Sequence, residues 1–185
     1  MPGFLMSYCK KCGQKTQESI PEGDHLPRAV CSSCGHIHYE NPKLIVGCIP
    51  EWENKILLCK RAIEPRFGLW TLPAGFMENY ETTAAGAARE TLEEANAHVR
   101  DLEAFTLYDI PHISQVYLMF RAKLTKPEYS ISPESSEVQL FDENNIPWDE
   151  IAFAAIKKTL RQYFEDRVKG QFSFHVGTIE APSRK

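Results

Sequence analysis

The chain has 185 residues, of which 43% are hydrophobic and 25% charged, and its formal net charge is −4. This length allows one hydrophobic core and one small additional module, and the composition excludes a disordered or fibrous protein. The acidic balance argues against a general binder of nucleic acid or membrane surfaces. No apolar run reaches the roughly 20 residues that cross a bilayer. The N-terminal MPGFLMSYCKKC also lacks the features of a secretory signal, so we expect a cytoplasmic protein.

Four of the six cysteines form two Cys-x-x-Cys pairs, each followed by a glycine, and eighteen residues separate the pairs. Two thiolates at this spacing can bind one metal ion, and the glycine permits the tight turn that aims backbone amides at sulfur. Together the pairs supply a closed four-thiolate site, for which Zn²⁺ is the usual occupant; a disulfide or redox pair is the alternative. We therefore predict a structural zinc ribbon over residues 1–42, with these ligands: Cys9, Cys12, Cys31 and Cys34.

The other two cysteines and two nearby histidines are given no chemical role. Cys48 and Cys59 stand within apolar runs and are predicted to be small buried hydrophobic residues. His36 and His38 follow the second cysteine pair and are predicted to lie at the surface, because four thiolates already complete a zinc site.

Beyond the ribbon, the chain predicts alternating strands and helices. Strands are expected at 44–49 and 55–59, joined by a hairpin turn at Glu53–Asn54, and an irregular loop at 66–76. A helix is predicted over 82–95, with Thr82 as N-cap and Asn96 at the left-handed C-terminal position. Further strands are expected at 98–109, 113–124 and 138–141, and an amphipathic helix at 148–169. The 113–124 strand alternates as if half buried, with Val116 and Phe120 on the inner face.

Three carboxylates are predicted to gather on one side of the helix over 82–95. Glu90 precedes Glu93 by three residues and Glu94 by four, so all three share a face. Such a cluster destabilises a helix unless a divalent cation neutralises it, and hard oxygen ligands select Mg²⁺ or Mn²⁺. The spacing favours a metal site, and a solvated acidic surface remains the alternative.

The segment around these acids follows a longer pattern: Gly75, five residues, Glu81, seven residues, then Arg89-Glu90-Thr91-Leu92-Glu93-Glu94. This segment resembles the Nudix box, and all six Gly, Glu and Arg positions through Glu94 match. The residues that depart from the box are Thr91, Asn96 and Ala97, none of them a metal ligand. The resemblance implies a Nudix α/β/α sandwich with a mixed sheet over residues 43–170, preceded by the zinc ribbon and followed by a tail at 171–185.

The resemblance also implies roles for these residues. Glu90, Glu93 and Glu94 would bind Mg²⁺ (or Mn²⁺), with the Gly75 carbonyl as a further ligand. Arg89 would pair with Glu81 and orient the acids. The metal would polarise a diphosphate and lower the pKa of a water for attack on phosphorus. In many members a loop glutamate beyond the box activates that water; the candidates here are Glu137, which is preferred because it directly precedes a short strand, and Glu134.

The similarity extends along nearly the whole chain, through NPKLIVGCI, GLWTLPAGF and a terminal FHVGTI. These segments, together with the ribbon, look like the FAD and ADP-ribose pyrophosphatase branch, which implies cleavage of the diphosphate between two nucleoside-like halves. NADH pyrophosphatases also carry a zinc ribbon, but they follow the box with a Ser-Gln-Pro-Trp-Pro-Phe-Pro run. The chain has SQVYLMF there instead, so NADH or another dinucleotide is the alternative substrate. Family members commonly form homodimers, although the sequence itself shows no interface.

Candidates for substrate contacts come from residue chemistry alone. Arg61 and Arg66 are expected to meet phosphates, and four aromatic residues are candidates for stacking on a base or flavin, with core packing as the alternative: Phe67, Trp70, Tyr108 and Tyr117. A nucleotide-sensing binder without turnover is the competing function, and a box lacking an acid would favour it. Every acid is present, so we expect an enzyme that acts on a small nucleotide, with neither nucleic acid nor membrane as a partner.

Overall fold

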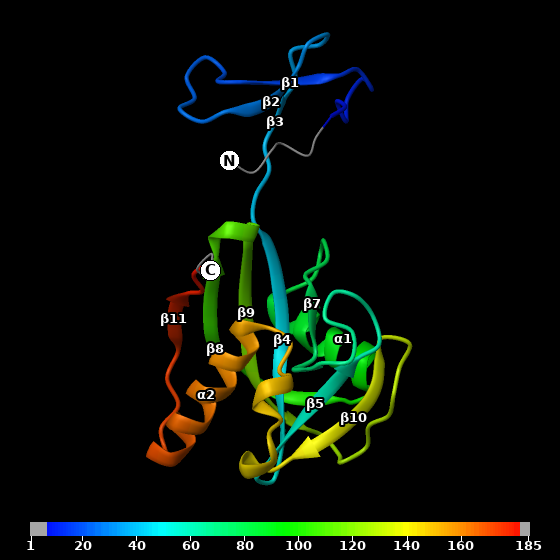
Figure 1. The fold of residues 1–185 in the computed structure, drawn as a ribbon, viewed down its shortest axis with the longest axis vertical. Coiled ribbons are helices and arrows are strands. Elements are labelled where there is room, and N and C mark those ends of the chain that lie inside the picture. The colour runs from blue at the N-terminus through cyan, green and yellow to red at the C-terminus, as the bar shows by residue number, and fades with distance from the viewer. Residues whose placement is uncertain (1–6, 182–185) are drawn as a thin grey trace. The chain divides into compact units, whose positions relative to one another are not determined.

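The computed structural model describes residues 7–181, which form two compact units that divide between Asn41 and Pro42 (Figure 1). The first unit is an antiparallel sheet of three short strands, β1 (Thr16–Ser19), β2 (Arg28–Cys31) and β3 (Ile37–His38). Among residues 7–41, the buried apolar side chains are Cys9, Ala29 and Cys31, too few for a hydrophobic core. A unit of this size needs another source of stability, and a bound metal is the usual one.

One surface prediction in this unit was wrong. His38 is only 6% exposed, while the neighbouring His36 is exposed and packs edge to face against it, with ring centroids 4.6 Å apart. The alternation of side chains along strand β3 turns His38 inward, whereas Ile37 is only partly buried.

The second unit is built on a mixed sheet with strand order β10-β5-β4-β9-β8-β11. The β4–β9 and β8–β11 pairs are parallel, and the other neighbours are antiparallel. Two short strands, β6 (Trp70–Thr71) and β7 (Ala74–Phe76), pair with β5 and β4. The main strands are β4 (Lys43–Trp52), β5 (Lys55–Arg61), β8 (Val99–Ile110), β9 (Gln115–Leu124), β10 (Ser135–Phe141) and β11 (His175–Thr178). The predicted hairpin between β4 and β5 is confirmed, with Glu53 in the left-handed region at φ 53°.

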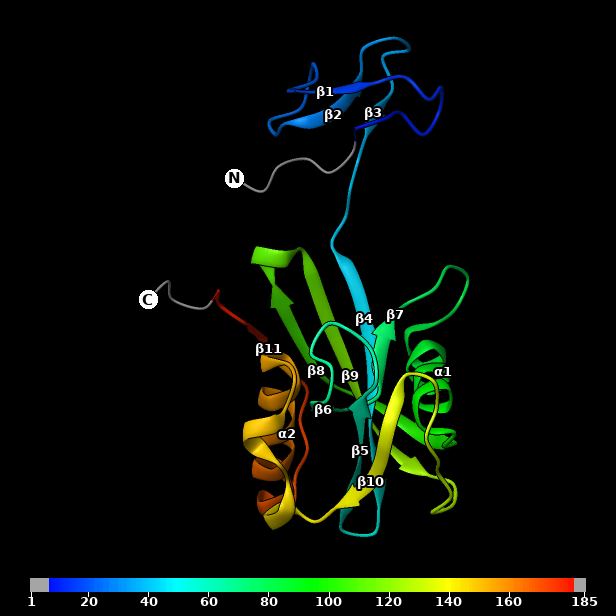
Figure 2. The same cartoon turned by 45° about the vertical axis from the view of Figure 1, so that its right-hand side comes forward.

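Two helices cover opposite faces of this sheet (Figure 2). The first, α1 (Thr83–Ala95), begins where the Thr82 hydroxyl accepts from the Ala85 amide at 3.1 Å and ends at Asn96, with φ 50°, as predicted. The second, α2 (Ala154–Lys169), ends at Gly170 with φ 68°. Short 3₁₀ turns occur at Pro111–Ile113, Glu143–Asn145 and Trp148–Glu150. The predicted α/β/α sandwich is thus confirmed.

The start of α2 differs from the prediction of a helix from residue 148. Residues 151–153 are not helical, because Ile151 forms a parallel bridge with Trp70 and the Ala152 amide donates to the Trp70 carbonyl at 2.8 Å. This pairing with a distant strand replaces the first helical turn.

Both faces of the central strand β9 are covered, so the prediction of a half-buried strand was wrong. Tyr117 and Met119 join the core cluster beneath α2, and Phe120 and Ala122 join the cluster beneath α1. The prediction for the lone cysteines is confirmed, since Cys48 and Cys59 are fully buried. Burial raises the pKa of the Cys48 thiol to about 12.

Part of the segment expected as a tail belongs to the sheet. Strand β11 pairs in parallel with β8 at one edge, and the Ile179 amide extends the pairing by donating to the Asp109 carbonyl at 2.8 Å. No helix in the described range, 7–181, is long and apolar enough to span a bilayer.

Candidate active site

Helix α1 presents the predicted acids at the edge of a pocket in the second unit. Glu90 and Glu94 are 8% and 5% exposed, whereas the Glu93 side chain is about half exposed. The two buried acids lie one turn apart on the face that meets β7, and Glu93 lies beside them toward solvent. The structure therefore brings all three carboxylates of the sequence prediction together.

Arg89 is the cation that holds this cluster. Its Nε and Nη2 atoms donate to the two carboxylate oxygens of Glu81, at 3.1 and 2.8 Å. Its Nη1 atom donates to Glu90 at 2.7 Å and to Glu93 at 2.8 Å. The hydrogen bonds from Arg89 and from the Glu78 amide hold the pKa of the Glu81 carboxyl at about 2. A planar guanidinium with five donors can serve three carboxylates at once, which an ammonium group cannot do with the same geometry.

Gly75 lies directly against one of the buried acids. Strand β7 pairs Gly75 with Val46 of β4, and an added Cβ at Gly75 would lie 2.4 Å from the Glu90 carboxylate. A side chain at this position would therefore require the Glu90 carboxylate to move. The glycine lets the backbone of β7 run along the acidic side of α1, and Gly75 lines the same pocket.

The charge of Glu94 is only partly compensated, by the Arg61 guanidinium and the Ala74 amide. Its Oε2 atom is buried and has no hydrogen-bond partner among the described residues. Burial, reinforced by the neighbouring Glu90 carboxylate, raises the pKa of Glu94 to about 8, and burial also raises the pKa of Glu90. A divalent cation beside these oxygens would supply the missing positive charge and favour the ionised form, so the donor set fits such an ion.

The two candidate loop glutamates lie in different places. Glu134 lines the pocket, and its negative charge adds to the pKa increase of Glu94. Glu137, the preferred candidate from sequence, is not among the lining residues, and its Oε1 atom accepts from Lys60 Nζ at 2.7 Å on the outer side of β10. A bulge in the β10–β5 pairing between Ser135 and Glu137 separates the two positions. The structure therefore brings Glu134, and not Glu137, to the acids.

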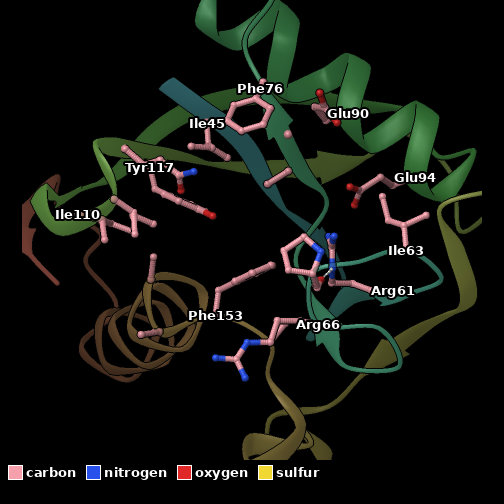
Figure 3. A pocket seen from close by; sticks show the side chains of 18 of the residues that line it. Ile45, Arg61, Ile63, Arg66, Phe76, Glu90, Glu94, Ile110, Tyr117 and Phe153 are labelled. Atoms are coloured by element: carbon pink, nitrogen blue, oxygen red, sulfur yellow. Dashed lines mark hydrogen bonds between the residues drawn. The ribbon is translucent and has the colours of Figure 1, made fainter. Parts of the chain in front are cut away.

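The pocket has a volume of about 700 Å³, within the range of small-molecule sites. It has an acidic side and an apolar side. Figure 3 shows Glu90 and Glu94 projecting from α1 on one side, with Ile110 and Tyr117 on the opposite side and Phe153 below them. A ligand with a charged centre and an apolar end would match this division.

The predicted substrate contacts are only partly brought to this pocket. Arg61, Arg66 and Tyr117 line it, and the Arg61 Nε donates to the Pro65 carbonyl at 2.8 Å. Trp70 is instead 5% exposed in the core, packed edge to face on Phe141. Tyr108 is likewise buried in the core, and Phe67 is exposed outside the pocket lining.

Sequence reasoning missed several lining residues. Phe153 lies just before α2, and the Arg61 guanidinium is 5.2 Å from its ring centroid. Helical periodicity could not single it out, since it lies in the non-helical residues before α2. Other lining residues that sequence reasoning missed include Ile45, Ile110, His112, Gln115, Ile179 and Glu180.

The first unit holds a second candidate metal centre. The Sγ atoms of Cys9, Cys12, Cys31 and Cys34 all lie within 4.8 Å of one another. The Lys11 amide donates to Cys9 Sγ and the Cys34 amide to Cys31 Sγ, both at 3.4 Å. The Cys34 amide and the Ser33 amide lower the pKa of the Cys31 thiol to about 6, which favours a thiolate. All six cysteines are free thiols, so the disulfide alternative is not realised.

Comparison with known families matches both parts of the chain. The NUDIX domain family matches residues 41–165, and the Nudix N-terminal family, a zinc ribbon, matches residues 7–40. This chain belongs to the Nudix family. The resemblance drawn from its box and cysteine pairs is therefore confirmed.

Similar Nudix proteins include both solved structures and named enzymes. A NUDIX hydrolase of Nitrosomonas europaea is 58% identical, with a TM-score of 0.92 over 95% of this chain and 100% of that one. The ADP-ribose pyrophosphatase of Methanocaldococcus jannaschii is 31% identical over 115 residues, 59% of this chain and 67% of that protein. The NAD-capped RNA hydrolase NudC of Vibrio atlanticus is 30% identical over 170 residues, 88% of this chain. The matched segment spans only 58% of that NudC's length.

Proposed function

We propose that this Nudix protein is a Mg²⁺-dependent (or Mn²⁺-dependent) pyrophosphohydrolase that cleaves the diphosphate of a nucleoside diphosphate-linked substrate, ADP-ribose or FAD. The observation that carries the proposal is the acidic side of the pocket, where one buried oxygen of Glu94 has no hydrogen-bond partner within residues 7–181. Glu90 and Glu93 line the same side, and both accept hydrogen bonds from Arg89, which is also bound by Glu81. This donor set suits a hard divalent cation, and such a cation binds a diphosphate.

In this proposal side chains of α1 and a backbone carbonyl of β7 would hold the metal. The ligands would be Glu90, Glu93, Glu94 and the Gly75 carbonyl. A bound Mg²⁺ would polarise the diphosphate and make an attacking water more acidic. Arg89 keeps Glu90 and Glu93 in position through the contacts described above and is itself fixed by Glu81.

Glu134 is the proposed general base. Its carboxylate lines the same pocket as the acids, and it would accept a proton from the attacking water as the new oxygen–phosphorus bond forms. The phosphorus–oxygen bond to the bridging oxygen then breaks, and the second phosphate leaves with that oxygen. Arg61 lies between the acidic and apolar sides and would offset the negative charge of the phosphates.

The other expectations from sequence complete the proposal. The four cysteines would bind one structural Zn²⁺, with the ribbon over 1–42, the hydrolase domain over 43–170 and the last segment over 171–185. We propose a cytoplasmic protein that acts on a small nucleotide without nucleic-acid or membrane partners, and a homodimer by analogy with the family.

A second candidate activity is hydrolysis of NADH or another nicotinamide dinucleotide. The similarity to the NAD-capped RNA hydrolase covers both the ribbon and the Nudix domain, over 88% of this chain. That protein's substrate contains the NAD moiety by its name, and the same acidic cluster would serve either diphosphate.

The test is a hydrolysis panel of ADP-ribose, FAD, NADH and nucleoside triphosphates with Mg²⁺. We expect ADP-ribose or FAD to be cleaved fastest, and Glu93→Gln to reduce turnover by about 10²-fold or more. Glu165→Gln, which removes an exposed carboxylate of α2, is the matched control and should keep wild-type rates. Absence of turnover of every substrate by the wild type would overturn the proposal. Equal turnover by Glu93→Gln would overturn the assigned metal ligands.

A further inference from the structure

The apolar side of the pocket is formed by side chains from five separate segments. They are Ile45 of β4, Ile110 at the end of β8, Tyr117 of β9, Phe153 before α2 and Ile179 after β11. Ile110 and Tyr117 are 7% and 8% exposed, so this wall is well packed from behind. Figure 3 shows Ile110, Tyr117 and Phe153 across the pocket from the acids.

The C-terminal segment contributes to this wall through a defined anchor. The His175 Nε2 atom lies 2.7 Å from Asp166 Oδ2 of α2, and the Ser173 amide donates to the same oxygen at 3.2 Å. From there β11 runs in register along β8, and the Ile179 amide donates to the Asp109 carbonyl. This register carries Ile179 and the following Glu180 to the pocket. The matched NUDIX domain ends at residue 165, so this part of the wall lies outside the shared domain.

The chemistry of the wall selects between the parts of a nucleotide. Ribose and ribose phosphate carry several hydroxyl groups, and these would lose hydrogen bonds to water against Ile45, Ile110 and Ile179. A planar nucleobase instead gains from contact with aliphatic and aromatic side chains. Gln115 and Glu180 at the rim offer an amide and a carboxylate to the polar edge of such a base.

We propose that the apolar wall is the nucleobase subsite, and that Ile179 and Glu180, which directly follow β11, form a specificity element that completes it. The proposal rests on the proposed function, because the acids fix where the phosphates lie. The base of the substrate's nucleoside half occupies the wall, and its phosphate extends past Arg61 toward α1. Asp166 acts as a positioning residue through His175, without touching the ligand.

The experiment measures binding of AMP and of ribose 5-phosphate to the full-length protein with Mg²⁺ by titration calorimetry. Neither compound contains a diphosphate, so the readout does not depend on turnover. We expect AMP to bind at least tenfold more tightly than ribose 5-phosphate. Ile179→Ala and Phe153→Ala should each weaken AMP roughly tenfold and leave ribose 5-phosphate unchanged.

Control variants distinguish the loss of a contact with AMP from a general disturbance of strand β11. Val176→Ala alters the same strand at a side chain that is 66% exposed and outside the pocket, and it should leave AMP binding unchanged. Asp166→Asn should weaken AMP selectively if the anchor positions the wall. Equal affinity of the wild type for the two compounds, or an equal loss of both in the Ile179 and Phe153 variants, would overturn the subsite. A wild type that hydrolyses nothing in the panel but still discriminates AMP in this way would overturn the proposed function and leave the subsite standing.

Discussion

Gly75 and Glu90 are in such close contact that a Cβ atom on the glycine would lie 2.4 Å from each carboxylate atom of the glutamate. We predict that Gly75→Ala displaces the Glu90 side chain and reduces turnover by about 10²-fold, because misplaced ligands cost rate steeply. The measurement is kcat for the best substrate of the panel, with circular dichroism as the check on folding.

The contact also supplies its own control. If the added methyl acts through Glu90, the double variant Gly75→Ala with Glu90→Gln should lose little more activity than Glu90→Gln alone. Fully additive losses would show that the methyl acts elsewhere.

The two loop glutamates give a direct contrast. Glu134→Gln should lower kcat by roughly 10²–10⁴-fold and remove the corresponding limb of the pH–rate profile, since the amide cannot accept the proton. Glu137→Gln removes only an exposed ion pair with Lys60 and should change kcat less than about twofold. The reverse ranking would assign the base to Glu137, as the sequence alone favoured.

Asn96 occupies the position where the Nudix box has glycine, and its side chain forms two hydrogen bonds. The Asn96 Nδ2 atom donates to Ser130 Oγ and to the Ile131 carbonyl, both at 2.9 Å, and these residues begin the loop that carries Glu134. Asn96→Gly keeps the left-handed backbone at no steric cost and removes only these two hydrogen bonds. We predict a several-fold lower kcat with KM nearly unchanged, while Asn96→Ala should also be less stable in urea. If the kcat of Asn96→Gly equals that of the wild type, these hydrogen bonds do not position Glu134.

Asp166 should make stability depend on pH in the acid range. Burial opposes ionisation of Asp166, but hydrogen bonds from His175, the Ser173 amide and Gln162 hold its pKa below the ordinary value. Because the folded state binds the proton less tightly than the unfolded state, this stability is present near neutral pH. It is lost as the pH falls through and below the ordinary Asp value of about 4. Urea unfolding at pH 7 and pH 3 should show a smaller change for Asp166→Asn than for the wild type. An equal change in the free energy of unfolding of both proteins would show that Asp166 does not cause the pH dependence.

The cysteine cluster predicts one zinc per chain. Metal analysis of the purified protein should find this ion, and Cys31→Ser should lose it, because the remaining three thiols no longer close the site. Circular dichroism and proteolysis should then show an unfolded first unit, since its described residues provide almost no other core. Cys59→Ser, at a fully buried thiol outside the cluster, is the matched control and should keep the zinc.

Local signals in the sequence were sufficient for several elements. Thr82 and Asn96 bound the first helix because capping depends on residues only a few positions apart. The spacing of Glu90, Glu93 and Glu94 likewise gathers them on one side of that helix. Each Cys-x-x-Cys pair is also a local signal, and the similarity of the two pairs predicts that they share one metal ion although eighteen residues separate them.

Features that depend on residues far apart in the chain could not be predicted from such local signals. Trp70 looked like a stacking residue, but pairing with β5 and the bridge to Ile151 draw it into the core. Both faces of β9 are covered because a helix packs on each side of the sheet, which strand periodicity alone does not reveal. The placement of Glu134 depends on a bulge, and that of Ile179 on an edge strand after the last helix.

The surplus of carboxylates around Arg89 has a consequence for the order in which ligands arrive. Carboxylates outnumber guanidinium groups in the pocket lining. The pocket without a cation therefore repels a diphosphate, although Arg61 and Arg66 offset part of the negative charge, and the repulsion grows as Glu94 ionises. On the proposed function, the negative charge of the pocket would repel a free nucleotide that arrives first. A cation that arrives first, or together with the nucleotide, would neutralise the carboxylates, so that the pocket attracts the diphosphate. On that proposal, occupancy by nucleotide would follow the supply of free divalent cation, and the cation would control entry of the substrate as well as its cleavage.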